Sequence, residues 1–262
     1  MVLIVLLFGA ASHVGAQGLP ASKDAEGPIE TDRPGNANAA TTVPQLRLQI
    51  ESSVSYAFDA DASGDSQLVS FPVALRFGVL SLLELRAGTS ILGIDAAANA
   101  DVVNPTDTSV GTKLQALAND RWRPHLGIVV DVFLPSGRGA FTAHVVVPDA
   151  RVAASWALPV GFGLLINAGA DVPGDIDGRF ARFVYVANLN YAPPIVDRRL
   201  SFFVETFGRI SRVGRDTVVQ IDAGAAFLLR ADWQLDMFIQ HAFTDQSPDF
   251  QIALGLSVRI GG

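Results

Sequence analysis

The sequence predicts an all-β fold, a 12-stranded antiparallel up-and-down transmembrane β-barrel with an N-terminal signal peptide. First, apolar and polar residues alternate with a period of two through successive stretches of the chain, as in β-strands with two different faces. Second, the chain is 49% hydrophobic and 17% charged, yet no window after the N-terminus offers the roughly 18 consecutive apolar residues of a membrane helix. Third, short and long connections alternate between the strands, as barrels require.

Residues 1–16 predict the signal peptide. They read MVLIVLLFGAASHVGA, an apolar run followed by small residues that end at Ala16. This order fits a cleavage site before Gln17, although no Lys or Arg precedes Lys23 to form a basic start. The alternative is a short buried strand or helix. We leave this stretch out of the fold.

Residues 17–42 show no alternation and predict a coil. Within it, Glu30-Thr31-Asp32-Arg33-Pro34-Gly35 combines opposite charges with a rigid proline and a permissive glycine. The coil should enter from the periplasmic side, because the first strand then rises to an external connection. We expect Asp32 and Arg33 to pair with charges of the wall and narrow the pore as a plug. The alternative is a disordered periplasmic tail.

Residues 43–262 predict the barrel. The alternating stretches are 46–58, 69–78, 83–91, 110–118, 123–134, 151–156, 162–171, 183–191, 200–206, 219–227, 235–243 and 250–260. Their apolar faces hold no Asp, Glu, Lys or Arg, which fits lipid contact, since Arg or Lys at mid-bilayer costs about 2–4 kcal/mol. A soluble sandwich alternates in the same way, so periodicity alone does not separate the two folds. Pro72 interrupts the second stretch and is tolerable at a strand irregularity.

Connection lengths and aromatic positions favour the barrel. Short breaks near Leu80, Asn119, Pro159 and Asp232 alternate with longer ones at 59–67, 95–107, 135–144, 172–179, 211–216 and 244–249, although the break at 192–198 is long for its place. Aromatic residues gather beside the short breaks: Phe77, Trp122, Trp156, Phe162, Tyr191, Phe227 and Trp233. This predicts an aromatic girdle at one membrane interface.

The inward faces carry charged residues, and buried charges must be paired or hydrated. They predict either a polar lumen that selects solutes or a structural network that fills a narrow barrel, and a 12-stranded barrel is compatible with both. The candidate lumen residues are Arg47, Glu51, Arg76, Glu84, Arg86, Lys113, Arg123, His125, Asp131, Glu205, Asp222, Asp236 and Arg259.

Several kinds of chemistry are disfavoured. The net charge of −7 argues against nucleic acid, and the absence of cysteine removes thiol chemistry. His125, His144 and His241 show no metal-ligand spacing, so we expect neither a metal site nor a cofactor. His241 could serve a barrel hydrolase as its base, but no Gly-x-Ser-x-Gly element is present and an interfacial histidine is the simpler interpretation. We therefore expect no enzyme.

Short motifs stand in a recognisable order along the chain. They are Thr31-Asp32-Arg33-Pro34-Gly35, Val43-Pro44, Val110-Gly111-Thr112-Lys113, Arg123-Pro124, Leu134-Pro135-Ser136-Gly137, Gln234-Leu235-Asp236 and Gly255-Leu256-Ser257. Their order and spacing resemble those of a bacterial outer-membrane family called "Putative MetA-pathway of phenol degradation", whose members are often labelled transporters. The resemblance covers nearly the whole mature chain, although Ile260-Gly261-Gly262 lacks the terminal aromatic residue of common barrel endings.

The resemblance implies a cell outer membrane location and passage of small organic solutes, including aromatic or hydrophobic ones, and it supplies no catalytic residues. We expect a passive channel or transporter. The alternative is a closed structural or adhesive barrel without transport; an outer-membrane hydrolase is a more distant alternative. The expected partners are outer-membrane lipids, a small solute and the barrel-assembly machinery that inserts the chain.

Overall fold

The computed structural model describes residues 27–61, 64–97, 100–117, 123–175, 178–194, 198–211 and 217–261. The expected signal peptide, residues 17–26 of the expected coil and Trp122 of the expected girdle lie outside these ranges.

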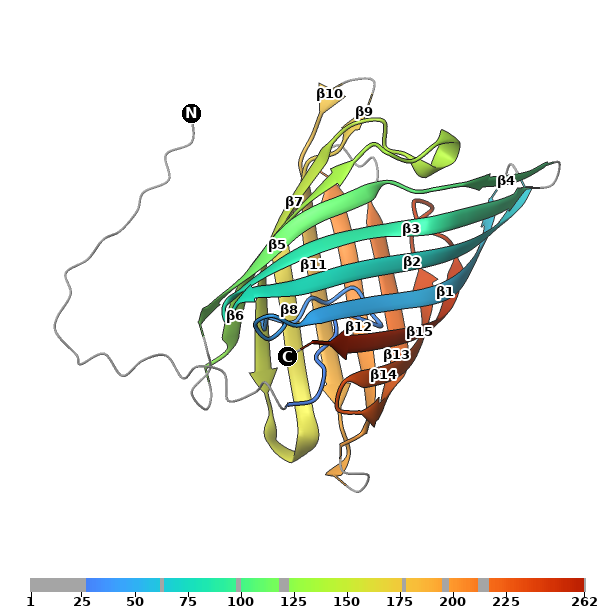
Figure 1. Ribbon diagram of the computed structural model, residues 1–262. Helices are drawn as coiled ribbons and strands as arrows, with labels where there is room; N and C mark the ends of the chain where they lie inside the picture. The colour runs from blue at the N-terminus through green and yellow to red at the C-terminus, as the bar shows by residue number, and fades with distance from the viewer. Residues whose placement is uncertain are drawn as a thin grey trace.

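One antiparallel sheet forms the wall of the molecule (Figure 1). Its strands are β1 (Leu48–Asp61), β2 (Gly64–Leu80), β3 (Leu83–Ala97), β4 (Ala100–Asn104), β5 (Thr108–Leu117), β6 (His125–Leu134), β7 (Val147–Ala157), β8 (Phe162–Asp171), β11 (Arg182–Tyr191), β12 (Leu200–Ser211), β13 (Val218–Arg230), β14 (Trp233–Ala242) and β15 (Phe250–Ile260). A small separate sheet pairs β9 (Gly174–Asp175) with β10 (Gly178–Arg179). Two 3₁₀ turns, Gly139–Phe141 and Pro159–Gly161, lie in connections.

The sheet closes on itself. β15 pairs with β1 from Leu48↔Ile260 to Phe58↔Phe250, and β1 pairs in turn with β2. β4 and β5 both pair with β3, one along each half of its length, so they form one interrupted strand of the wall. Counted in this way, the described residues form a closed barrel of 12 antiparallel strands, which confirms the fold predicted from the alternation.

Several strands continue past the predicted bounds. β1 and β2 pair as far as Asp61↔Gly64, so the predicted long connection at 59–67 is wrong. β3 likewise pairs with β4 up to Ala97↔Ala100, inside the predicted connection at 95–107. The alternation was read from apolar residues, whereas the ladder of backbone hydrogen bonds continues among polar ones. Pro72 lies at a register shift between β2 and β3, as expected for a residue without an N–H group.

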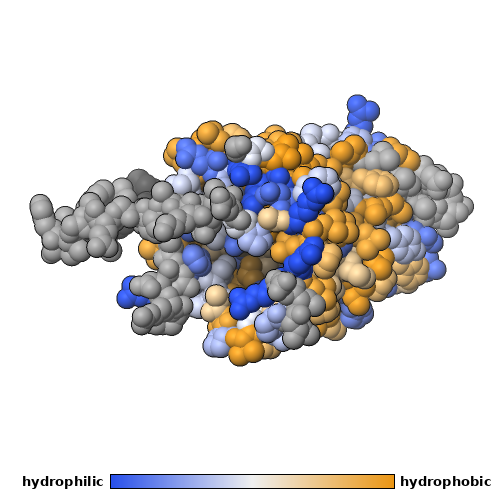
Figure 2. Space-filling model, turned by 60° about the horizontal axis from the view of Figure 1, so that its bottom comes forward, coloured by the Kyte–Doolittle hydropathy of each residue, from blue (hydrophilic) through white to orange (hydrophobic). Residues whose placement is uncertain are grey.

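The two faces of the wall are opposite to those of a soluble protein. In β14, Trp233, Leu235, Met237 and Ile239 are exposed on the outside, and they alternate with Gln234, Asp236, Phe238 and Gln240, which are buried inside. Figure 2 shows hydrophobic residues over much of the barrel's flank and hydrophilic ones gathered toward one end. Among the described helical turns, none has the length or hydrophobicity needed to cross a membrane.

Aromatic residues gather near the ends of the strands that short turns join. Phe162 stacks on Tyr191 with ring centroids 4.6 Å apart, and the Arg199 guanidinium lies 5.2 Å from the centroid of Phe227. Trp233 is exposed at the start of β14. We call this the short-turn end and the opposite one the long-loop end.

Residues 27–47, here called the N-terminal segment, run inside the barrel from the short-turn end (Figure 1). The Ile29 N–H donates to the Ala231 carbonyl (2.6 Å) and the Thr42 hydroxyl to the Ser81 carbonyl (3.0 Å), and both acceptors belong to short turns. Ala37, Ala39, Ala40 and Val43 of the segment are buried. The segment is therefore packed against the interior of the wall along much of its length.

Candidate functional site

Asp32 of the N-terminal segment lies among three cations of the wall. Its carboxylate oxygens accept hydrogen bonds from the Lys113 ammonium at 2.9 Å, and lie 3.2 Å from an Arg86 nitrogen and 3.6 Å from Arg76 Nε. Burial by itself would raise the pKa of Asp32, but Arg76, Lys113 and Arg86 outweigh it and hold that pKa well below its usual range. Asp32 is therefore ionised and fixed by β2, β3 and β5.

The same cations are also paired with carboxylates of the wall. Arg76 donates to both oxygens of Glu84, at 2.8 and 3.0 Å, and to Glu51 at 2.8 Å. Arg86 lies 3.5 Å from Asp131. The Lys113 and Glu84 side chains are fully buried. A buried charge without a partner is costly, so each member of this network stabilises the charges that it contacts.

A second anchor lies across the lumen on β14. Arg33 donates to the Asp236 carboxylate at 3.2 Å, and the Gln234 amide donates to the Thr31 hydroxyl at 2.8 Å. Arg33 and Asp236 were both candidates from the sequence, and the structure brings them together.

A third anchor involves two carboxylates on β12 and β13. Glu205 accepts the backbone N–H groups of Asn36 (2.5 Å) and Ala37 (3.1 Å), and the Asn36 side chain donates to Asp222 at 2.8 Å. A Cβ atom at Gly35 would lie 2.6 Å from a Glu205 oxygen, so a side chain at this position would force the buried Glu205 carboxylate or the segment to shift.

Further wall side chains bond the backbone of the segment. Asn167 accepts the Asn38 N–H at 2.6 Å and donates to the Asn38 carbonyl at 2.9 Å. Ser155 accepts the N–H of Ala40, and Glu84 that of Val43. The segment has no strand partner for most of its length, so these side chains satisfy groups that burial would otherwise leave unpaired.

Two cavities lie beside the segment. The larger, of about 450 Å³, is lined by wall residues that include Leu165, Asn188, Asn190, Phe203, Glu205 and Gln234. The smaller, of about 190 Å³, is lined by wall residues that include Ser53, Ser55, Ser70, Pro72, Phe238 and Gln240. Arg33, Pro34 and Gly35 line both cavities, so both cavities adjoin this short stretch of the segment.

The remaining candidates lie near the short-turn end. Arg259 donates to the Asp232 carboxylate at 2.7 Å and to the Gly27 carbonyl at 2.5 Å. Arg47 immediately precedes β1, Arg123 is exposed before β6, and His125 lines the larger cavity. Within the described ranges, no group of three or more His, Asp or Glu residues could hold a metal ion.

The structure also contains lumen charges that the sequence candidates omitted, all toward the long-loop end. Arg151 donates twice to Asp149, at 2.9 and 2.7 Å, and Arg182 makes the same paired contact with Asp171. Arg209 lies 3.4 Å from Asp171. Asp149, Arg182 and Arg209 lay beyond the predicted strand bounds. Continuing the period-two alternation into the polar ends of the strands would have placed these three residues on the inward face.

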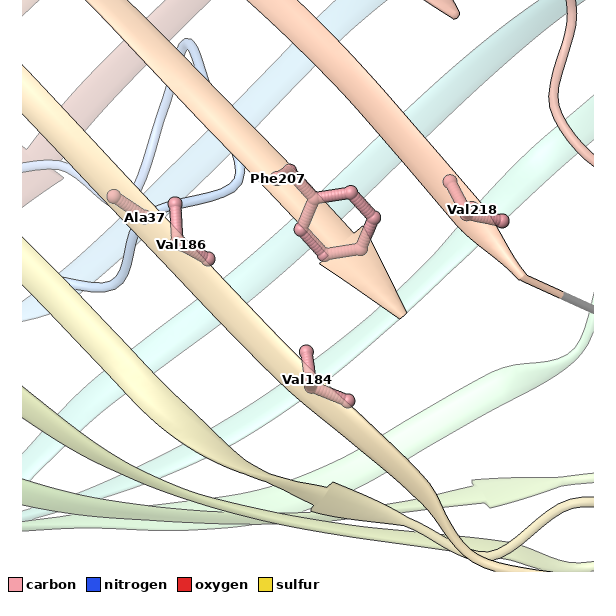
Figure 3. Close-up of a cluster of buried hydrophobic side chains, with 5 residues drawn as sticks. All are labelled: Ala37, Val184, Val186, Phe207 and Val218. Atoms are coloured by element: carbon pink, nitrogen blue, oxygen red, sulfur yellow. The ribbon is translucent and has the colours of Figure 1, made fainter. Parts of the chain in front are cut away.

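An apolar cluster covers part of the lumen wall between these charges and the third anchor. Its buried members are Ala37, Val184, Val186, Phe207 and Val218 (Figure 3). Ala37 belongs to the N-terminal segment and the others to β11, β12 and β13. The lumen therefore combines charged and apolar surfaces.

Solved structures with a similar shape are outer-membrane β-barrels. An outer-membrane channel from Pseudomonas putida F1 matches with a TM-score of 0.65 and 15% identity, over 87% of this chain and 99% of that one. The NanC porin matches with a TM-score of 0.54 and 9% identity, over 81% of this chain and 100% of that one. The translocator domain of the autotransporter NalP from Neisseria meningitidis matches with a TM-score of 0.52 and 14% identity, over 84% of this chain and 90% of that one. At these identities the likeness shows the fold.

Among proteins with curated descriptions, none matches the chain. The family model described as "Putative MetA-pathway of phenol degradation" matches residues 31–260. This range includes the anchors from Asp32 to Ala40 and every strand of the wall. The chain therefore belongs to the "Putative MetA-pathway of phenol degradation" family.

Proposed function

We propose that the protein spans the outer membrane as a passive channel for small organic solutes. The observation that carries this proposal is a charged lumen with two cavities, both lined by Arg33, Pro34 and Gly35, inside a wall whose outer face is apolar. Such a wall suits lipid contact outside and hydrated solutes inside. The short-turn end would face the periplasm and the long-loop end the outside.

The path is gated by the N-terminal segment. The segment is held by hydrogen bonds and ion pairs rather than by a strand ladder, so it can shift without breaking the wall. The larger cavity has the size of small-molecule sites, and Leu165 and Phe203 lie in it beside Asn188 and Asn190. Together with the family's description, this lining supports small aromatic or hydrophobic solutes that carry a polar group.

The proposal includes delivery to the membrane. Residues 1–16 would act as a signal peptide, and the barrel-assembly machinery would insert the mature chain among outer-membrane lipids.

The proposal includes no enzymatic step at His241. His241 Nδ1 lies 2.9 Å from the Asp249 carbonyl oxygen and its ring meets Phe243 edge-on. Among the described residues, no hydroxyl or carboxylate side chain bonds to it, so lipid hydrolysis, if measured, should be unchanged by His241→Ala.

A closed structural barrel is the second candidate, because the wall bonds the segment's backbone at many points. Current recordings in planar bilayers and swelling of liposomes in erythritol and in sodium benzoate at neutral pH separate the two. Discrete current steps and swelling would support the channel. Bilayers and liposomes that stay sealed to every solute would contradict it and favour the closed barrel.

A further inference from the structure

Three arginines lie in the lumen toward the long-loop end, outside the contacts that hold the N-terminal segment. Arg151 is near the start of β7, Arg182 begins β11 and Arg209 is near the end of β12. Arg182 and Arg209 both lie within salt-bridge distance of Asp171. A solute that enters from this end meets the three cations before it reaches the stretch Arg33–Gly35.

The three arginines are not equally paired. Arg151 and Arg182 each make two short hydrogen bonds to one carboxylate, of Asp149 and Asp171 respectively. Among the described residues, the salt-bridge partner of Arg209 is Asp171, which lies 3.4 Å from Arg209 Nε and is already engaged by Arg182. Arg209 Nε is buried and makes no hydrogen bond to the described residues. Within the described part of the chain, these three arginines form their salt bridges with two carboxylates, and Arg209 is the one left incompletely bonded.

The surroundings of Arg209 are apolar on one side and open on the other. Its guanidinium carbon lies 5.2 Å from the ring centroid of Phe207, and Val184 is its partner across the β11–β12 ladder. Phe207 and Val184 are buried members of the apolar cluster (Figure 3). About a third of the Arg209 side chain (32%) remains exposed. A partly exposed planar cation thus lies at the edge of a buried apolar cluster.

We propose that Arg209 is a recognition site for small organic carboxylates with an apolar body. The guanidinium donates to both carboxylate oxygens, a geometry in which arginine forms strong paired bonds. The apolar body lies toward Phe207, next to the place where Ala37 of the N-terminal segment meets the cluster. This inference rests on the proposed channel function and specifies the class of solute that the channel prefers.

Calorimetric titration of the full mature chain in detergent tests the proposal, with protein-free micelles as blanks. The probes share one ring and differ in charge: benzoate, benzyl alcohol and benzylamine. We expect benzoate to bind at least about tenfold more tightly than the other two, because benzoate alone of the three offers a charged acceptor to the guanidinium.

Variants locate the site. Arg209→Gln should weaken benzoate about tenfold and leave benzyl alcohol unchanged, and Arg209→Lys should restore part of the loss. Phe207→Leu should weaken benzoate more than acetate. Arg179→Gln is the matched control, because it removes one positive charge from the exposed β10 at the same end. Heat-modifiable migration on a gel verifies that each variant is folded.

Three outcomes would overturn the proposal: equal binding of the three ring compounds, unchanged benzoate binding in Arg209→Gln, or an equal loss in Arg179→Gln. An equal loss in Arg179→Gln would indicate that benzoate is attracted by the overall positive charge at the long-loop end rather than by a site at Arg209. Liposome swelling keeps the two proposals apart. Entry of erythritol without preferential binding of benzoate would support the channel and contradict the carboxylate site. Binding of benzoate by a barrel that is sealed to solutes would support the carboxylate site and contradict the channel.

Discussion

At the residue scale, Gly35 is a point of close contact between the segment and the wall. Gly35→Ala places a methyl group 2.6 Å from a Glu205 oxygen, so Glu205 or the segment must move and the bonds to Asn36 and Ala37 weaken. We expect a destabilisation of about 1–3 kcal/mol and a higher single-channel conductance. Gly174→Ala is the control, since its nearest contact is an ordinary 3.4 Å. Equal conductance in the Gly35 variant and the intact protein would contradict this prediction.

The charge of Asp32 is shared by three cations of the wall. Asp32→Asn removes the nearest anion of the fully buried Lys113 and leaves Arg76 and Arg86 with fewer partners. We expect a loss of about 3–5 kcal/mol, as for breaking a buried pair. Unfolding of purified protein by denaturant measures it. Glu30→Gln, in an exposed residue of the same segment, should have little effect.

The difference in unfolding free energy between the intact protein and Asp32→Asn should depend on pH. The folded-state pKa of Asp32 is lowered, so its contribution is complete above the unfolded pKa of about 4 and is lost as pH falls through the folded value. The stability gap between the intact protein and Asp32→Asn should therefore stay constant from about pH 7 to 5 and narrow below about pH 4. A stability difference that widens as the pH falls would contradict this prediction.

Sequence reasoning reached the inward positions of many charges but not their partners. Alternation assigns a side chain to the inner face, which is how Arg76, Glu84 and Lys113 became candidates. The pairing of Asp32 with Lys113 joins residues 81 positions apart and depends on the path of a segment that has no periodicity. Local patterns contain no information about such a path. The role of the segment as a plug stays a prediction.

At the element scale, the N-terminal segment should be separable from the wall. Deleting residues 18–42 after the signal leaves β1 to β15 and the Leu48↔Ile260 closure intact. The deletion also removes Asp32, Arg33 and Asn36, which hold the segment between the cavities. We expect higher single-channel conductance from a barrel that still inserts. A shorter deletion of 18–26 retains all the described contacts and should conduct like the intact chain.

Element ends were harder to predict than element existence. Every wall strand except the short β4 overlaps a stretch of alternation, whereas the outer ends of β1, β2, β3 and β12 were cut short. Inside the bilayer, lipid contact selects apolar residues at alternate positions, so the pattern is strong there. Beyond the bilayer both faces meet water, the pattern fades and the backbone ladder continues without it.

At the scale of the whole molecule, closure depends on the β1–β15 seam. Removing residues 250–262 deletes the strand that joins β14 to β1 and exposes two edges. We expect that truncation to abolish heat-modifiable migration on a gel, while removal of residues 261–262 alone should preserve it. A truncated chain that still shows the shift would mean that the barrel closes without β15. The number and direction of the strands were predictable because bilayer thickness and closure limit the possibilities.

The wall holds the N-terminal segment largely by its main chain. The N–H groups of Asn36, Ala37, Asn38, Ala40 and Val43 donate to side chains of Glu205, Asn167, Ser155 and Glu84. The path of this stretch therefore depends on wall side chains that accept hydrogen bonds from its backbone. Each acceptor removed from the wall should release a length of the segment, whereas side-chain changes at exposed positions such as Glu30 should not.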